Sequence, residues 1–213
     1  MKKINRNLGL YFIIDGNFTR DFVKMTRLAI DIGLKIIQYR DKNANASEML
    51  TNAIKIRELT ENSDTIFIVN DNVEVARASN ADGVHIGQED TQYEEARKLL
   101  PKRIIGMSVG NLEQSLLAEK MGADYIGLGP IFPTLTKPNA GQIIGTEKLS
   151  KIVKAVQIPI IAIGGINLSN LKSVLETGVN GVAIISAILG SSNPEREIKK
   201  IKNKINKYNQ MKG

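Results

Sequence analysis

The chain has 213 residues, of which 42% are hydrophobic and 24% charged, a composition typical of one globular domain and not of a disordered, collagenous or fibrous protein. It lacks cysteine, which excludes disulfides, thiolate metal sites and cysteine nucleophiles. Its longest apolar runs, about nine residues, are less than half the roughly 20 that a membrane-spanning helix needs. No apolar signal core follows the basic start, so we expect a cytoplasmic protein with one domain over residues 1–213.

The formal net charge of +7, from 29 Lys and Arg against 22 Asp and Glu, raises the question of a polyanionic partner. Residues 1–6 and 195–213 together carry ten of the cations and two of the acids, which leaves 19 cations and 20 acids in residues 7–194. The excess therefore belongs to the ends, chiefly to a basic C-terminal helix expected at about 194–209. Charged runs are usually solvated helix faces, so we expect neither a nucleic-acid nor a membrane partner. A nucleic-acid-binding tail is the alternative.

Short apolar or β-branched runs alternate with amphipathic stretches along the chain. We expect strands at 10–14, 36–40, 66–70, 83–87, 104–109, 125–129, 159–163 and 181–186. Helices are expected between and after them, at about 20–32, 47–61, 73–79, 92–100, 112–121, 146–156, 168–176 and 194–209. Several of the strands are almost wholly hydrophobic, as parallel strands covered on both faces are. The α/β pattern predicts a single (β/α)8 TIM barrel, with a six-unit doubly wound sheet as the alternative.

Polar residues that follow barrel strands require an explanation, because barrels carry their chemistry at the C-terminal ends of the strands. After the second expected strand, Gln38, Arg40 and Lys42 alternate and therefore point the same way, toward the barrel mouth. Two cations and an amide on one face suit a phosphate or diphosphate. A ring of salt bridges inside a small barrel is the alternative.

Carboxylates follow the next two strands. The third strand ends in Asn70 and Asp71, and the fourth runs into Asp90. Hard oxygen ligands beside a phosphate site favour Mg²⁺, which binds one or two carboxylates together with substrate phosphates. General acid–base chemistry, or an Asp71 that only caps the next helix, are the alternatives. His85, the one histidine, fits a wall residue and a proton carrier equally well.

The later strands offer a second phosphate site. The fifth strand ends at Ser108, and the long connection 130–145 holds Thr134, Thr136 and Lys137 between prolines, as in a preorganised lid. The last two strands lead into Gly165 and into Ile185 with Ser186, where barrels usually bind phosphate, although a tight turn would also use glycine. Two opposed sites predict a reaction in which a metal-bound diphosphate leaves and a monophosphorylated partner attacks.

Seven sequence blocks at these strand ends resemble the thiamine-phosphate synthase (thiamine-phosphate pyrophosphorylase) family. They are QYRDK at 38–42, VND at 69–71, VHIGQED at 84–90, MSVG at 107–110, GPIFPTLTK at 129–137, AIGGI at 162–166 and ISAI at 185–188. The resemblance runs from about residue 10 to residue 189. The related thiazole tautomerases share this barrel but tend to lack the QED block and the PTxTK loop, both of which are present here.

The resemblance implies small-molecule partners: a pyrimidine diphosphate, 4-amino-2-methyl-5-(diphosphooxymethyl)pyrimidine, and a thiazole phosphate or its 2-carboxy form. With Mg²⁺ as cofactor, diphosphate would leave first, a pyrimidine carbocation would form, and the thiazole nitrogen would capture it to give thiamine phosphate. The sequence leaves the oligomeric state open, and a homo-oligomer is compatible with it.

The resemblance also implies a role for each site residue. The residues expected to hold the pyrimidine diphosphate are Gln38, Arg40, Lys42 and Asn70, with Ser108 and Lys137 also touching this substrate. Asp71 and Asp90 would bind Mg²⁺. Thr134 and Thr136 would contact the thiazole, and its phosphate would be held by Gly165, Ile185 and Ser186. The catalytic residues would be Arg40, Lys42, Ser108 and Lys137.

Overall fold

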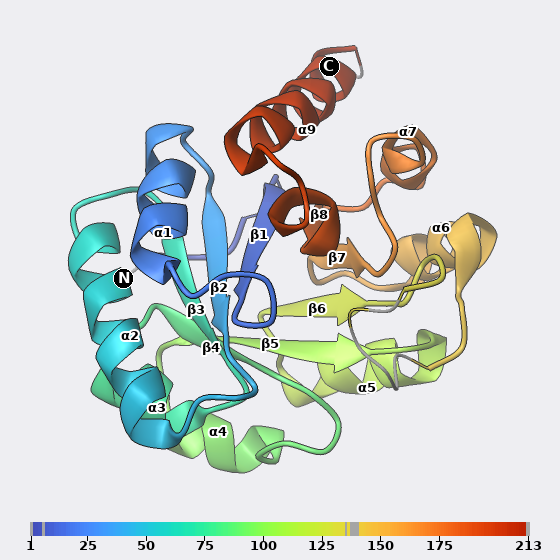
Figure 1. The fold of residues 1–213 in the computed structure, drawn as a ribbon. Coiled ribbons are helices and arrows are strands. Elements are labelled where there is room, and N and C mark those ends of the chain that lie inside the picture. The colour runs from blue at the N-terminus through green and yellow to red at the C-terminus, as the bar shows by residue number, and fades with distance from the viewer. Residues whose placement is uncertain (1, 6, 135, 137–140, 212–213) are drawn as a thin grey trace.

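Eight parallel strands form a closed barrel in the computed structural model, which describes residues 2–5, 7–134, 136 and 141–211 (Figure 1). The strands are β1 (Gly9–Asp15), β2 (Ile36–Arg40), β3 (Ile66–Asn70), β4 (Gly83–Ile86), β5 (Ile104–Val109), β6 (Tyr125–Leu128), β7 (Ile160–Ile163) and β8 (Gly181–Ile184). Each strand pairs with the next, and β8 pairs with β1 to close the sheet. The predicted TIM barrel is confirmed, and the doubly wound sheet is excluded.

Helices follow the strands and cover the outside of the barrel. They are α1 (Phe22–Asp31), α2 (Ala46–Thr60), α3 (Val73–Ala78), α4 (Tyr93–Leu99), α5 (Leu112–Met121), α6 (Gly145–Ala155), α7 (Leu171–Leu175), α8 (Ser186–Leu189) and α9 (Pro194–Gln210). The sequence did not predict α8, because a single helical turn is too short to show a periodic pattern. Four of the helices begin after an asparagine whose side chain accepts a backbone N–H of the first turn, namely Asn45, Asn72, Asn111 and Asn193.

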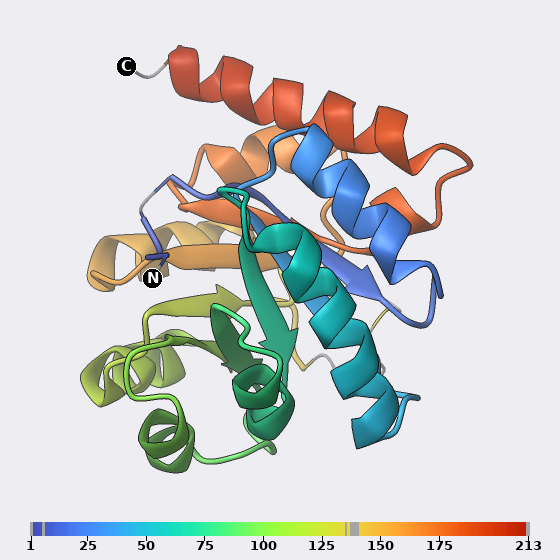
Figure 2. The same ribbon diagram turned by 90° about the vertical axis from the view of Figure 1, so that its left-hand side faces the viewer.

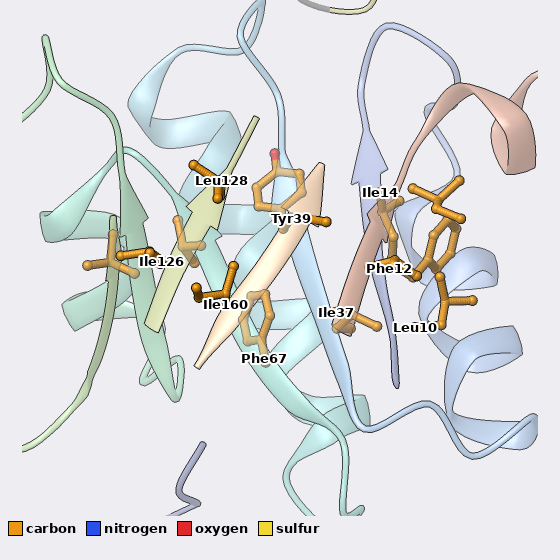
Figure 3. Close-up of a cluster of buried hydrophobic side chains, with 14 of the residues drawn as sticks. Leu10, Phe12, Ile14, Ile37, Tyr39, Phe67, Ile126, Leu128 and Ile160 are labelled. Carbon is orange, nitrogen blue, oxygen red and sulfur yellow. The ribbon is translucent and has the colours of Figure 1, made fainter. Parts of the chain in front are cut away.

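The two faces of the barrel sheet pack into two hydrophobic cores. On β1, Leu10, Phe12 and Ile14 face outward and pack against the helices (Figure 3). Tyr11 and Ile13 alternate with them and pack inside the barrel. Successive strand residues point to opposite faces, so this alternation decides which polar side chains at the strand ends reach the barrel interior.

The C-terminal helix α9 is amphipathic and lies across the barrel exterior (Figure 2). Its isoleucines Ile198, Ile201 and Ile205 are buried, and the helix packs against β1, α7 and α8. On its exposed face Lys199 pairs with a glutamate one turn earlier, at 2.5 Å. The basic stretch thus has the character of a solvated helix face. Among the described residues, none of the helices is both long and apolar enough to span a membrane.

Neutralising lysines on the exposed face of α9 should change the stability of the protein little. In a Lys199→Gln, Lys200→Gln variant we expect the free energy of unfolding to change by less than about 1 kcal/mol, because exposed helix ion pairs each contribute a few tenths. Urea denaturation of both proteins measures the difference. Duplex DNA binding by the unsubstituted protein that falls steeply with salt, and that the two substitutions weaken, would contradict the expected absence of a nucleic-acid partner.

Candidate active site

A cavity of about 570 Å³ opens where the C-terminal ends of the strands meet, an end of the barrel called here the mouth. Every residue predicted for the site that the structure describes lines this cavity. These residues are Gln38, Arg40, Lys42, Asn70, Asp71, Asp90, Ser108, Thr134, Thr136, Gly165, Ile185 and Ser186. Lys137 lies outside the described residues. The closed topology therefore gathers residues that are up to about 150 positions apart in the sequence.

Arg40 is held in the cavity wall by a carboxylate that the sequence analysis missed. Its guanidinium forms an ion pair with Asp15, whose side chain is completely buried. The two residues face each other in the pairing of β1 with β2. Asp41, the next residue along, instead pairs with Arg20 at 2.7 Å. The position of Asp15 as the last residue of β1 was the one available signal for its role.

Lys42 forms an ion pair with Asp71, so both cations of the predicted phosphate site have a carboxylate partner. The salt bridges that were the alternative explanation for these cations therefore do form. They do not remove the cations from the cavity, because Lys42 remains half-exposed and lines it together with Arg40.

Both the backbone conformation of Asp71 and the surroundings of its carboxylate are energetically unfavourable. Its φ of 61° lies in the left-handed region, which is uncommon for a residue other than glycine and is concentrated at functional sites. Burial and, after it, the neighbouring Asp90 carboxyl raise the pKa of the Asp71 carboxyl to about 6, against the opposing effect of Lys42. The side chain of Asn72 caps α3 by accepting the Val75 N–H at 2.9 Å. The alternative that Asp71 is merely the cap of that helix is therefore wrong.

The donor set at Asp71 and Asp90 suits a hard divalent cation. Two neighbouring carboxylates disfavour each other's ionisation, and a bound cation would relieve that repulsion. Among the described residues, no group of three or more His, Cys, Asp or Glu side chains gathers to form a complete protein metal site. A cation held here would need further oxygen ligands from water or from a bound phosphate, which is how Mg²⁺ is usually held.

The cavity wall also contains a continuous series of hydrogen bonds. Gln38 Nε2 donates to Tyr11 Oη at 2.9 Å, and Tyr11 Oη lies 2.9 Å from Tyr125 Oη. His85 Nδ1 lies 3.0 Å from Tyr125 Oη, and His85 Nε2 lies 2.9 Å from Ser108 Oγ. Sequence analysis missed the two tyrosines, whose only signal was an aromatic residue at an inward-facing strand position.

On the other side of the cavity, glycines allow two loops to meet. Gly164 and Gly165 have φ values of 98° and 65°, in the left-handed region that favours glycine. A Cβ at Gly165 would lie 2.5 Å from the carbonyl oxygen of Pro133, in the loop after β6. The turn geometry therefore accounts for both glycines by itself, and phosphate binding at Gly165 stays a prediction. Ile185 and Ser186 lie at the start of α8 and face the same cavity.

A parallel eight-stranded barrel with cations, paired carboxylates and hydroxyls around a cavity at its mouth defines a TIM-barrel protein with an enzyme-like site. A sequence model of the thiamine monophosphate synthase family matches residues 10–188. The thiamine-phosphate synthase of Archaeoglobus fulgidus is 43% identical over 201 residues, covering 94% of this chain and 95% of that protein. That of Pyrococcus abyssi is 47% identical over 197 residues, covering 91% and 94%.

The solved structure of thiamine phosphate pyrophosphorylase from Pyrococcus furiosus superposes with a TM-score of 0.86 at 45% identity, covering 94% of this chain and 98% of that one. The chain therefore belongs to the thiamine monophosphate synthase family, and it is an enzyme of the transferase class. The resemblance drawn from the seven sequence blocks is confirmed.

Proposed function

We propose that this enzyme joins the pyrimidine diphosphate to the thiazole phosphate and releases thiamine phosphate and diphosphate. With the 2-carboxy form of the thiazole, the carboxyl group also leaves, as carbon dioxide. One observation carries the proposal: a single cavity contains both predicted anion sites, with the paired carboxylates Asp71 and Asp90 beside the first. The membership of the family supports it. A site for one phosphorylated substrate would not need both sides of the mouth.

In this proposal the first side of the cavity binds the leaving group. Arg40 and Lys42, with Gln38 and Asn70, hold the pyrimidine diphosphate, and the diphosphate competes with Asp71 for the ammonium of Lys42. Asp71 and Asp90 hold Mg²⁺, which neutralises charge on the departing diphosphate when it is bound. Arg40 stays anchored by Asp15, so its charge is already in position when negative charge develops on the leaving oxygen.

Bond breaking precedes bond making in the proposed reaction. The bond between the pyrimidine methylene carbon and the diphosphate oxygen breaks, and its electron pair leaves with the diphosphate. The thiazole nitrogen then donates its lone pair to the carbocation. Thr134 and Thr136 contact the thiazole, and Gly165, Ile185 and Ser186 hold its phosphate. Ser108 and Lys137 contact the pyrimidine, and no protein nucleophile is required.

Purified protein incubated with both substrates and Mg²⁺ should release diphosphate and thiamine phosphate in equal amounts. Omitting either substrate, or adding a chelator, should abolish formation of thiamine phosphate, because the attacking nitrogen or the charge neutralisation is then missing. Chromatography of the product, together with a coupled diphosphate assay, measures both quantities. The absence of product with Mg²⁺ and with Mn²⁺ would defeat the proposal.

The second candidate is rearrangement of the carboxylated thiazole phosphate alone, the activity of a thiazole tautomerase. The observation that favours it is His85, a proton-carrying group in the cavity wall 2.9 Å from Ser108. Incubating that thiazole without the pyrimidine and following its NMR spectrum separates the two reactions. An unchanged thiazole, together with thiamine phosphate formation from both substrates, supports the synthase.

A further inference from the structure

Five side chains from five different strands are connected across the inside of the barrel, and three of them have no role in the proposed reaction. The series runs from Gln38 on β2 through Tyr11 on β1, Tyr125 on β6 and His85 on β4 to Ser108 on β5, and is called here the cross-barrel chain. All five residues line the cavity. Its two ends, Gln38 and Ser108, are both among the residues placed at the pyrimidine substrate.

Glycines on β5 and β6 leave space for the cross-barrel chain where a larger residue would overlap its side chains. Gly106 of β5 lies between His85 of β4 and Tyr125 of β6 in the strand pairing. A Cβ at Gly106 would overlap the Tyr125 ring, and one at Gly127 would lie 3.0 Å from His85 Cε1. The histidine and tyrosine rings therefore meet over a glycine, with their centroids 5.4 Å apart. Side chains two strands apart are brought into hydrogen-bonding distance in this way.

The arrangement that uses both phenolic hydrogens within the chain runs in one direction. Burial raises the pKa of both Tyr11 and Tyr125, so each phenol keeps its one hydrogen at neutral pH. Gln38 donates from Nε2 to Tyr11. If both phenolic hydrogens are used within the chain, Tyr11 donates to Tyr125 and Tyr125 donates to His85 Nδ1. A neutral imidazole has one N–H, which must then be on Nε2 and be donated to Ser108 Oγ. The hydroxyl hydrogen of Ser108 is left to point elsewhere.

We propose that Tyr11, Tyr125 and His85 are positioning residues that couple the hydrogen-bonding pattern of Gln38 to that of Ser108. While the amide nitrogen of Gln38 donates into the chain, its oxygen is available to accept from a ligand, and Ser108 is available to donate. Reversal of the amide would reverse every link and would make Ser108 donate to His85 instead. A bound ring must therefore present a hydrogen-bond donor to the oxygen of Gln38 and an acceptor to the hydroxyl of Ser108. This inference rests on the proposed function for the identity of that ring.

The single histidine makes the direction of the chain directly measurable. In protein labelled with ¹⁵N-histidine, a long-range ¹H–¹⁵N spectrum shows which imidazole nitrogen carries the hydrogen. We expect Nε2–H in a mildly alkaline buffer, in which an ordinary imidazole is neutral. In a Gln38→Glu variant the ionised carboxylate can only accept, so the chain should reverse and the hydrogen should move to Nδ1.

A matched control removes the middle link. Tyr125→Phe should make the His85 spectrum insensitive to a second substitution, Gln38→Glu, because the two residues are no longer connected. Nδ1–H in the unsubstituted protein would overturn the proposal. An unchanged tautomer in Gln38→Glu would also overturn it, as would the same change with and without the Tyr125 hydroxyl.

Kinetics give a second readout. We expect Tyr125→Phe to lower kcat/KM for the pyrimidine diphosphate about tenfold, roughly the effect of one displaced hydrogen bond, while KM for the thiazole phosphate stays within about twofold. Equal losses for both substrates would indicate a general structural role and would overturn the positioning role. The spectra need no substrate, so failure of the unsubstituted protein to form thiamine phosphate would defeat the proposed function and leave the tautomer result standing.

Discussion

Replacing Arg40 with alanine is expected to lower kcat/KM for the pyrimidine diphosphate by about 30- to 1,000-fold, or on the order of 2 to 4 kcal/mol of transition-state stabilisation. The physical reason is the loss of a prepositioned charge beside the oxygen on which negative charge develops. Steady-state kinetics with the pyrimidine diphosphate varied at saturating thiazole phosphate and Mg²⁺ measures this loss. Unchanged turnover would contradict the role assigned to Arg40.

The same substitution leaves Asp15 as a completely buried carboxylate without the ion pair that holds Arg40. Removing one partner of a buried pair costs about 3 to 5 kcal/mol of stability, so lost activity could reflect unfolding. The matched control is the double variant Asp15→Asn, Arg40→Met, in which the carboxylate charge is removed as well. We expect this variant to recover most of the stability in urea denaturation but not the activity. Recovery of both would show that the charge of Arg40 is dispensable.

Replacing Asp71 with asparagine is expected to reduce Mg²⁺-dependent turnover at least about 100-fold and, in metal-free protein, to raise the free energy of unfolding by about 1 kcal/mol. The pKa of Asp71 is raised to about 6 from the ordinary aspartate value of 3.8, so the folded protein holds this proton more tightly than the unfolded chain does. The resulting stability is present at low pH and is lost as the pH rises toward 6. Asparagine avoids that loss, and it tolerates the φ of 61° better.

The gain in stability of the metal-free Asp71→Asn variant should therefore depend on pH. Urea denaturation without metal should show little difference between the two proteins at about pH 4 and the full difference above about pH 7. A Mg²⁺ titration of turnover checks the functional half of the prediction. Glu89, a neighbouring acid that also lines the cavity, provides the matched control. Glu89→Gln should keep the metal dependence, and an unchanged Mg²⁺ titration in Asp71→Asn and Asp90→Asn would remove both residues from the metal site.

Much of the barrel could be predicted from the sequence because the signals are local. Hydrophobic runs and their period-two alternation are set by neighbouring residues, and they located all eight strands to within a residue or two of their observed bounds. The same alternation puts Gln38 and Arg40 on the inward face, since it continues from Ile36 inside the barrel. The location of the charge excess was equally accessible, because α9 needs only a 3.6-residue period to show one buried stripe and one solvated face.

Side-chain partners were decided only by the tertiary structure. Asp15 on β1 forms an ion pair with Arg40 on β2, and the Tyr11 and Tyr125 hydroxyls are hydrogen-bonded although the two residues are 114 positions apart in the chain. No local pattern encodes such pairs, because they depend on the order and register in which the strands close the barrel. The sequence by itself determined the fold and most of the polar residues that face the mouth. Closure of the sheet determined which charges neutralise one another there and which hydroxyls are connected, since both depend on distances across the barrel.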